Sequence, residues 1–373
     1  MGLSILLIMV FIAGIFSCSK PAAPAPAPSP TAKPAPAPAP SPTVKPSPTP
    51  TGAAQVPPPG AEKINLKYAG SMPVEHVLTK GELKFKELVE SRSKGVITVD
   101  VFPASQLYKD TDFPNVIPAG TIDISQGSPG KWAGIVPAVL YTNLPGIFDD
   151  YEHHFRFVDG LGYTILDRQM QKVDTKLLGY GFYGGAWGIM SNKPIKVMAD
   201  IKDMKIRATD ATVQTALIAL GAKAVVLSSG EAYTAMQRGT IDAAMSAVSS
   251  FVERKWYEVA KNSTFFPNPT SWCGTSFPVF MSLKKWNSLQ PWAQELIRQA
   301  AIDANEYTRP LAMKSDTDDT ETIKSKTASY FLPQDEWAKW RAIAVKAAVD
   351  NYIETAGDAG KEILAAVEAT RKK

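Results

Sequence analysis

The stretch that decides the fold lies between 204 and 244 and reads MKIRATDATVQTALIALGAKAVVLSSGEAYTAMQRGTIDAA. Short apolar runs predict three strands, at 204–207, 222–227 and 241–244. Between them, apolar residues at helical spacing predict two helices, and Gly221 ends the first. Ser228 and Glu231 form a capping-box pattern at the start of the second helix, because each side chain can bind the other residue's backbone N–H. This order of elements is typical of a parallel sheet with helices on its faces.

The same alternation appears nearer the N-terminus. There, predicted strands at 64–68 and 97–101 flank a helical pattern at 78–89. Further along the chain, apolar residues recur every three or four positions across 289–307, and this spacing predicts a long amphipathic helix. The segment from Asp335 onward is also helical in pattern. Two α/β units with helices crossing between them predict two lobes separated by a cleft.

The amino-acid composition argues against several classes of function. The 373 residues are 45% apolar, which is enough for a sizeable core, and the formal net charge is only +4. No block of Lys and Arg is present, so we expect no nucleic-acid partner. Cys18 and Cys273 are the only cysteines, which excludes a disulfide framework and a cysteine-based metal site if Cys18 carries a lipid.

The N-terminus predicts export. An apolar run at 3–16 is too short to span a bilayer comfortably and suits the core of a signal peptide. The following Ser17-Cys18 resembles a lipobox, so we predict a signal at 1–17 and lipidation of Cys18. An ordinary cleaved signal and a retained membrane anchor are the alternatives. The remainder of 18–60 is dominated by Pro, Ala, Ser and Thr and predicts an extended tether, at about 3.1 Å per residue.

Several longer sequence segments, in their order and spacing, resemble the substrate-binding subunits of TRAP transporters. These are the tripartite ATP-independent periplasmic transporters, and the resemblance is to their DctP-like group. The resemblance covers nearly all of 61–373. The segments that carry it are FKELV at 85–89, VDVFPASQL at 99–107, LPGIF at 144–148, YEH at 151–153, IKDMKIR at 201–207, YTAMQRGTIDA at 233–243 and KWYEVAK at 255–261.

The resemblance implies a periplasmic-binding-protein (Venus flytrap) fold, in which two α/β domains joined by a long helix close over one ligand. We place the first lobe at 61–185 plus about 275–312, and the second at 186–274 plus about 313–373. The implied partners are a small and a large integral membrane subunit, powered by an ion gradient. We expect a monomer that is extracytoplasmic and lipid-anchored, in a periplasm or on the outer face of the cytoplasmic membrane.

Arg207 is the main candidate for ligand binding. It ends a predicted strand just before a helix, and ligands of open α/β sheets bind at the carboxyl ends of strands. A guanidinium meets a carboxylate with two parallel hydrogen bonds. In the family that the chain resembles, the Arg at this position binds the ligand carboxylate. The alternative is a surface Arg or an interdomain salt bridge.

Trp187 stands where several members of that family carry a second Arg. The replacement argues against a dianionic ligand and favours monocarboxylates, because Trp187 offers an apolar wall or a stacking surface. The alternative is a tryptophan packed in the core at the hinge.

Four further residues follow predicted strands and are candidate ligand contacts. Ser71 lies in the loop after the first strand, Ser128 and Trp132 follow the strand at 122–125, and Ser246 follows the strand near 243. Glycines in these loops permit close approach of the backbone to a ligand. Helix capping is the alternative for the serines, and packing is the alternative for Trp132.

We find no pattern for catalysis, a cofactor or a metal. The acidic and histidine-rich run at 149–154 predicts the first turn of a helix, because carboxylates are stabilised at the positive end of the helix dipole. His76 is isolated in the sequence. No nucleophile–base pair, Walker loop or dinucleotide fingerprint is present. The predicted function is therefore capture of a small organic acid for a membrane importer. A sensing subunit for a signalling partner is the alternative, and an enzyme on a similar scaffold is a more distant one.

Overall fold

The computed structural model describes residues 57–267 and 272–372. The predicted signal at 1–17, Cys18 and nearly all of the Pro/Ala-rich segment lie outside the described residues. The described chain contains two sheets. None of its helices is both long and apolar enough to cross a membrane.

The first sheet has five strands in the order β2-β1-β3-β10-β4. These are β1 (Ile64–Gly70), β2 (Ile97–Phe102), β3 (Ile124–Gln126), β4 (Thr175–Gly184) and β10 (Thr275–Ser282). β1 pairs in parallel with β2 and β3, whereas β10 is antiparallel to β3 and β4. The parallel strands therefore end at one edge, where the loops after β1 and β3 lie together.

The second sheet has six strands in the order β11-β9-β5-β8-β6-β7. These are β5 (Trp187–Ser191), β6 (Lys205–Ala208), β7 (Lys223–Val226), β8 (Ala243–Ala247), β9 (Asn262–Phe265) and β11 (Ala328–Phe331). The order predicted from 204–244 is confirmed, with β6, β7 and β8 in parallel. The capping box is present at α6 (Ser229–Gln237), where Ser228 and Glu231 bind each other's backbone N–H. The last strand begins at Ala243, two residues later than predicted.

Helices cover both sheets. They include α1 (Val77–Arg92), α3 (Tyr151–Asp159), α4 (Leu161–Gln171), α5 (Ala211–Ala219), α7 (Val248–Glu253), α8 (Leu283–Ser288), α9 (Pro291–Lys326) and α10 (Gln334–Ala369). Shorter helical turns are α2 (Phe113–Val116), η1 (Pro129–Trp132), η2 (Pro137–Asn143), η3 (Met198–Ile201) and η4 (Trp256–Glu258). The predicted long helix is α9, with 36 residues.

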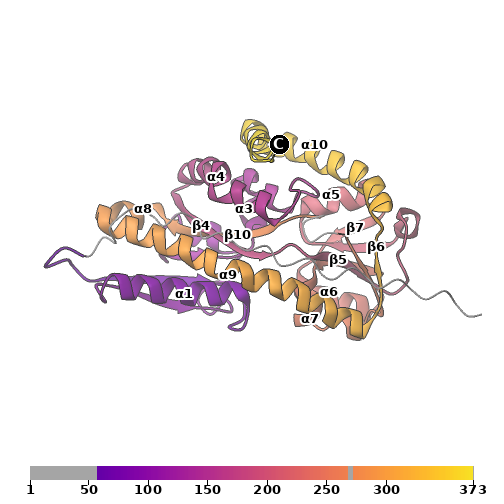
Figure 1. Ribbon diagram of the computed structural model, residues 1–373, viewed down its shortest axis with the longest axis horizontal. Coiled ribbons are helices and arrows are strands. Elements are labelled where there is room, and N and C mark those ends of the chain that lie inside the picture. Colours follow the sequence, from indigo (N-terminus) through magenta and orange to yellow (C-terminus); the bar gives the residue numbers. More distant parts are fainter. Residues whose placement is uncertain (1–56, 268–271, 373) are drawn as a thin grey trace, which may run out of the picture. The chain divides into compact units, whose positions relative to one another are not determined.

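α9 joins the two sheets. Its first half packs on α1 and β4, where Ala293, Ala300 and Ala304 enter the core of the first sheet. Its second half packs on α7 and β11, and Ile323 enters the core of the second sheet. Figure 1 shows α9 running from beside α1 to beside α7. The predicted α/β fold with two sheets and a long connecting helix is confirmed.

α10 also contacts both halves of the molecule. It packs against α5 of the second sheet and against η2 and α4 on the other side. The hydroxyl of Tyr352 donates to the carbonyl oxygen of Ala138 at 2.8 Å. The sequence analysis placed this segment with the second lobe alone, but its apolar face is shared, because α10 covers the junction of η2 and α5.

Candidate ligand-binding site

Arg207 lies on the face of β6 opposite to its neighbours. Ile206 and Ala208 enter the core cluster beneath α5, whereas the guanidinium of Arg207 lies over the Trp256 ring, 5.9 Å from its centroid. Strand alternation produces this separation. The side chain is only 4% exposed. β6 therefore presents a buried cation near its carboxyl end.

The guanidinium of Arg207 has hydrogen bonds but no direct ion pair with a carboxylate among the described residues. Nε donates to the carbonyl oxygen of Leu227 and Nη1 to that of Met245, both at 2.9 Å. No described carboxylate lies within 4 Å of it. Burial lowers the pKa of Arg207 to about 10, while the negative charges of Asp210 and Glu231 favour its protonated form, so the group is still charged at neutral pH. A buried charge without a partner is costly, and an anionic ligand would remove that cost.

Asp210, three residues after Arg207, contacts loops that belong to the first sheet. Asp210 caps α5, and its carboxylate accepts from the N–H groups of Thr212 and Val213 at 2.8 and 3.1 Å. It also accepts from Nδ2 of Asn143, in η2, at 2.5 Å. A Cβ placed on Gly130 would lie 3.8 Å from the Cβ of Asp210. The loop after β3 therefore meets the turn that follows Arg207.

Ser71 and Ser128 follow adjacent strands of the first sheet, as the predicted site requires. β1 and β3 pair with Gly70 opposite Gln126, and the N–H of Ser71 donates to the carbonyl oxygen of Gln126 at 3.2 Å. Within the described chain, Oγ of Ser71 is buried without a hydrogen-bond partner. The Ser128 side chain makes no capping bond to η1. Helix capping, the alternative for these serines, does not account for either hydroxyl.

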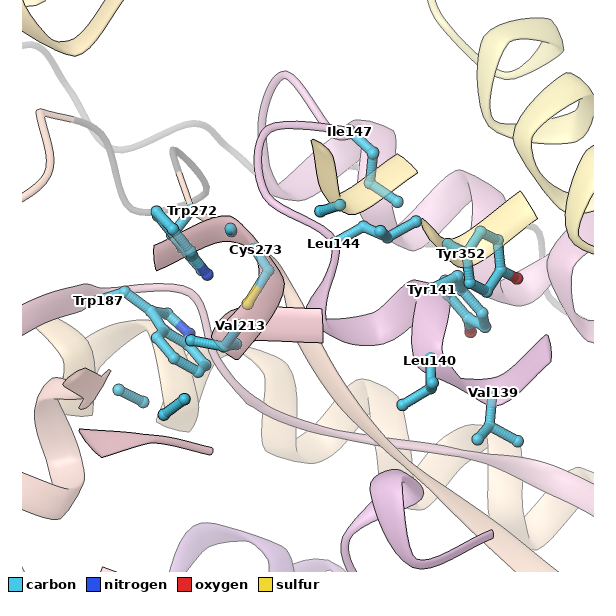
Figure 2. Packing of buried hydrophobic residues seen from close by; sticks show 14 of the residues in the cluster. Val139, Leu140, Tyr141, Leu144, Ile147, Trp187, Val213, Trp272, Cys273 and Tyr352 are labelled. Atoms are coloured by element: carbon cyan, nitrogen blue, oxygen red, sulfur yellow. The ribbon is translucent and has the colours of Figure 1, made fainter. Parts of the chain in front are cut away.

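Ser246 shares the face of Arg207, and Trp187 does not. Arg207 pairs with Ala244, and Ser246 lies two residues further along β8. Trp187 pairs with Ala247, one residue beyond Ser246, so its ring points to the opposite face. There it lies beside Val213, with Trp272 and Cys273 nearby (Figure 2). The ring is buried, and this position matches the alternative of a packed tryptophan at the hinge.

Trp132 also lies in packed surroundings. The side chain is 2% exposed, and its ring centroid lies 4.7 Å from that of Phe280. The geometry fits the packing alternative. A ligand contact by Trp132 stays a prediction.

Tyr183 is a residue at the site that the sequence analysis did not find. Its hydroxyl lies 3.2 Å from Oγ of Ser250, so it joins the end of β4 to α7. Its ring lies between those of Phe277 and His76, with centroids at 4.9 and 5.0 Å. Both faces of Tyr183 are therefore covered, and only its edge is open to a ligand.

His76 is not isolated in the structure. Nδ1 accepts from the N–H of Leu78 at 3.1 Å and caps α1, while Nε2 lies 3.5 Å from Oε1 of Glu253 in α7. Burial lowers the pKa of His76 to about 4, so the ring is neutral. The two residues are far apart in sequence, and no local pattern indicated the contact.

A cavity of about 310 Å³ lies beside this contact. It is lined by residues of α1, β4, α7 and α9 and of the loop before α1: Glu75, His76, Val77, Lys80, Tyr183, Ser249, Glu253, Leu311, Lys314, Ser315, Asp318 and Asp319. A space of this size suits a small organic molecule. The cavity thus lies between elements of both halves of the molecule, and its lining includes none of the predicted ligand contacts.

The acidic run at 149–154 begins α3, as predicted. Asp150 is the capping residue, and its carboxylate accepts from the N–H of His153 at 2.7 Å. Within 57–267 and 272–372, no three His, Cys, Asp or Glu side chains are grouped as metal ligands would be.

Comparison with known proteins identifies the family. Residues 68–355 match the DctP family, described as bacterial extracellular solute-binding protein, family 7. The C4-dicarboxylate-binding periplasmic protein DctP of Rhodobacter capsulatus is 27% identical over 315 residues, which cover 83% of this chain and 91% of that protein.

Solved structures agree. A TRAP periplasmic solute-binding protein from Ochrobactrum anthropi is 28% identical, with a TM-score of 0.75, over 83% of this chain and 96% of that one. One from Sulfurospirillum deleyianum, with bound succinate, is 26% identical with a TM-score of 0.71, over 83% and 100%. These likenesses cover both sheets and the connecting helix.

Proposed function

Because the chain belongs to the DctP family of bacterial extracellular solute-binding proteins, we propose that it captures a small organic carboxylate at Arg207 and delivers it to a TRAP-type importer. The observation that carries the proposal is the guanidinium of Arg207, buried at the carboxyl end of β6 without a carboxylate partner among the described residues. Relatives that are named for C4-dicarboxylate binding or hold succinate support a carboxylate ligand.

In the proposed mechanism, the ligand enters between the two sheets and its carboxylate accepts hydrogen bonds from the free N–H groups of Arg207. Ser71 and Ser128 contact it from the first sheet, and Ser246 contacts it from the second. Closure excludes water, which strengthens the charged hydrogen bonds. Binding and closure are coupled because the ligand has a higher affinity for the closed state.

The two lobes of this mechanism are 61–185 with about 275–312, and 186–274 with about 313–373. All strands of the first sheet lie in the first set, and all strands of the second sheet lie in the other. The chain passes between the sheets at Gly184–Ala186 and after Phe265, and again within α9. These are the positions at which a hinge is expected.

We further propose a periplasmic or cell-surface location, with Cys18 lipidated and 18–60 as the tether. The proposed partners are the small and large integral membrane subunits of the importer, and the protein acts as a monomer. A tether of about 40 residues in polyproline form reaches on the order of 100 Å, which lets a lipid-anchored protein meet its membrane partner.

The test is thermal unfolding of the protein with a panel of carboxylates, for wild type, Arg207→Ala and Arg207→Lys. A ligand at a hundred times its Kd adds about 2.7 kcal/mol of stability to wild type. We expect one acid class to raise the melting temperature of wild type, with no rise for Arg207→Ala. Lysine keeps the charge but loses the planar fork, so Arg207→Lys should show a partial rise. An equal rise in all three proteins would contradict the role of Arg207.

A further inference from the structure

His76 and Glu253 form a contact between the two halves of the molecule. His76 lies directly before α1, which packs on the first sheet, and Glu253 lies in α7, which follows a strand of the second sheet. Nε2 of His76 is 3.5 Å from Oε1 of Glu253. His76 ends the loop that begins with Ser71, and α7 directly follows β8, the strand that contains Ser246. The contact therefore joins two elements that carry predicted ligand contacts.

The proton of the His76 ring lies on the nitrogen that is near Glu253. Nδ1 accepts from the backbone N–H of Leu78 at 3.1 Å and thereby caps α1. Burial lowers the pKa of His76 to about 4, so the ring is neutral. A neutral imidazole that accepts at one nitrogen carries its proton on the other. Nε2–H is therefore the donor of the contact, and the Glu253 carboxyl group is the acceptor.

The contact belongs to an arrangement in which groups of both halves are buried. Arg207 is 4% exposed in the second half, and Oγ of Ser71 is buried in the first. Beside the contact, the ring of Tyr183 stacks on that of His76 at 5.0 Å, and its hydroxyl reaches α7. Separation of the halves would break both interactions with α7. The structure therefore describes the closed arrangement.

Charged and titratable groups surround Glu253 from each neighbouring element. They are Glu75, His76 and Lys80 from α1 and the loop before it, Tyr183 from β4, Arg254 from α7 itself, and Lys314, Asp318 and Asp319 from α9. Burial is the main cause that raises the pKa of Glu253 to about 7. The positive charge of Arg254 opposes this rise, and the negative charge of Asp319 adds to it. The closed arrangement therefore holds a proton on Glu253 more tightly than water does.

We propose that His76 and Glu253 form a latch that holds the two lobes closed over the ligand and slows its release. The inference rests on the proposed binding of a carboxylate at Arg207, and it adds two positioning residues to that function. The latch acts on the dissociation rate, because the contact has to break before the lobes separate. Since closure raises the pKa of Glu253, ligand affinity is highest in acid and falls as pH rises toward about 7.

Stopped-flow kinetics and titration calorimetry test the latch, with the carboxylate that raises the melting temperature most. The variants are His76→Asn, Glu253→Ala and the double variant. Asn is a favourable capping residue that keeps an acceptor for the N–H of Leu78, but it is too short to reach Glu253. Glu75→Gln is the matched control. Glu75 is an exposed carboxylate that lines the same cavity and has no ion pair or hydrogen bond among the described residues.

We expect His76→Asn and Glu253→Ala each to raise the dissociation rate about three- to tenfold, as loss of one hydrogen bond does. The association rate should stay within about twofold of wild type. The double variant should lose no more than either single variant, because both changes remove the same contact. Glu75→Gln should behave as wild type. Thermal unfolding without ligand checks that each variant is folded.

A pH series separates a latch from a contact that only supports the fold. The Kd of wild type should rise at least about threefold between pH 5.5 and 8. The rise is limited because the Glu253 side chain is 35% exposed, so water screens part of the effect. Glu253→Gln keeps an acceptor but cannot titrate, so its Kd should change less over the same range. Groups that titrate elsewhere are the same in both proteins and cancel.

Three results would overturn the latch while leaving carboxylate binding intact. They are losses that add in the double variant, unchanged dissociation rates in both single variants, and an equal pH dependence of Kd in wild type and Glu253→Gln. If no carboxylate binds wild type, the proposed function fails, and the latch, which acts on that ligand, fails with it.

Discussion

Arg207 and Glu82 are both buried ionisable side chains without an ion pair, and they respond to burial in opposite ways. Arg207 lies near the carboxyl edge of the second sheet and keeps its charge, since burial lowers its pKa only to about 10. Glu82 lies in α1 beneath the end of β1, is 1% exposed, and has no hydrogen-bond partner for either oxygen among the described residues. Burial raises its pKa to about 8, so it is neutral at pH 7.

The opposite responses of Arg207 and Glu82 to burial distinguish a group suited to bind an anion from a group with a structural role. A carboxyl group avoids the free-energy cost of a buried charge by taking up a proton, whereas a guanidinium stays charged at any physiological pH. A buried Arg without a carboxylate in direct contact is therefore stabilised by an external anion. A buried Glu that has become neutral loses the cost of a buried charge, and the missing side chain of Gly70 leaves space for its carboxyl group.

The largest effect is expected from the pH dependence of stability at Glu82. The pKa of Glu82 in the folded state lies above the 4.5 of an ordinary Glu, so the folded state holds the proton more tightly. Its contribution to stability is complete below pH 4.5 and is lost as pH rises toward about 8, at roughly 1.4 kcal/mol per pH unit. Glu82→Gln should remove that slope, so the variant becomes several kcal/mol more stable than wild type at pH 8.

Urea unfolding at pH 5, 6, 7, 8 and 9 measures this difference. Glu87→Gln is the matched control, because Glu87 is an exposed residue of the same helix. The buried groups that titrate elsewhere affect wild type and variant equally and cancel in the comparison. If Glu82→Gln and wild type change in parallel over the whole range, Glu82 is not a neutral buried acid.

The second experiment concerns the space that Gly70 leaves for this acid. A Cβ placed on Gly70 would lie 2.2 Å from Oε1 of Glu82, far inside van der Waals contact. Gly70→Ala should therefore lower the free energy of unfolding by about 3 kcal/mol, as overpacking of a core does. The double variant Gly70→Ala with Glu82→Ala should recover much of that loss. Losses that add instead of compensating would show that the two residues do not compete for one space.

The sequence predicted the place of Arg207 in the fold better than the surroundings of its side chain. Arg207 could be found because a strand and a helix flank it within a few residues. Glu82 also left a signal, since it occupies an apolar position of the helical stripe formed by Leu78, Phe85 and Val89. Tyr183 left no such signal. Its place depends on how α7 and the end of β4 come together, which no local pattern records.

Trp187 shows a different limit of sequence analysis. Trp187 begins β5, and its side chain points to the face opposite Arg207. Alternation along β5 and its register with β8 decide that face, and a shift of one residue would reverse it. Register across a sheet depends on tertiary packing, so the sequence alone could not choose between a cleft wall and a core tryptophan.

Asp316 is a third buried ionisable group, and its carboxylate is hydrogen-bonded to other parts of the chain. We therefore expect its removal to lower the free energy of unfolding by an intermediate amount. Its carboxylate accepts from the hydroxyl of Tyr151 at 2.7 Å and from the N–H of Gly185 at 2.8 Å. It thus ties α9 to the segment between β4 and β5. Asp316→Ala should lower the free energy of unfolding by about 2 kcal/mol, since it leaves a buried N–H without a partner.

Tyr151→Phe provides the comparison for Asp316. It removes only the hydroxyl bond and should cost about 1 kcal/mol in chemical denaturation. Asp316→Asn, which keeps a carbonyl acceptor for Gly185, should fall between wild type and Asp316→Ala. If Asp316→Ala is as stable as wild type, the carboxylate does not hold the crossing segment.

The smallest effect on binding is expected at Trp187, which also tests the division of the second sheet into two faces. Because its ring packs near Val213, Trp272 and Cys273, Trp187→Phe should lower the free energy of unfolding by about 1–2 kcal/mol through lost packing. The Kd for the best acid should change less than about threefold, since the Trp187 ring lies on the sheet face opposite Arg207. Denaturation and titration of the same preparation separate the two quantities. A tenfold weaker Kd with unchanged stability would place Trp187 in the ligand site and would contradict the separation of the two faces.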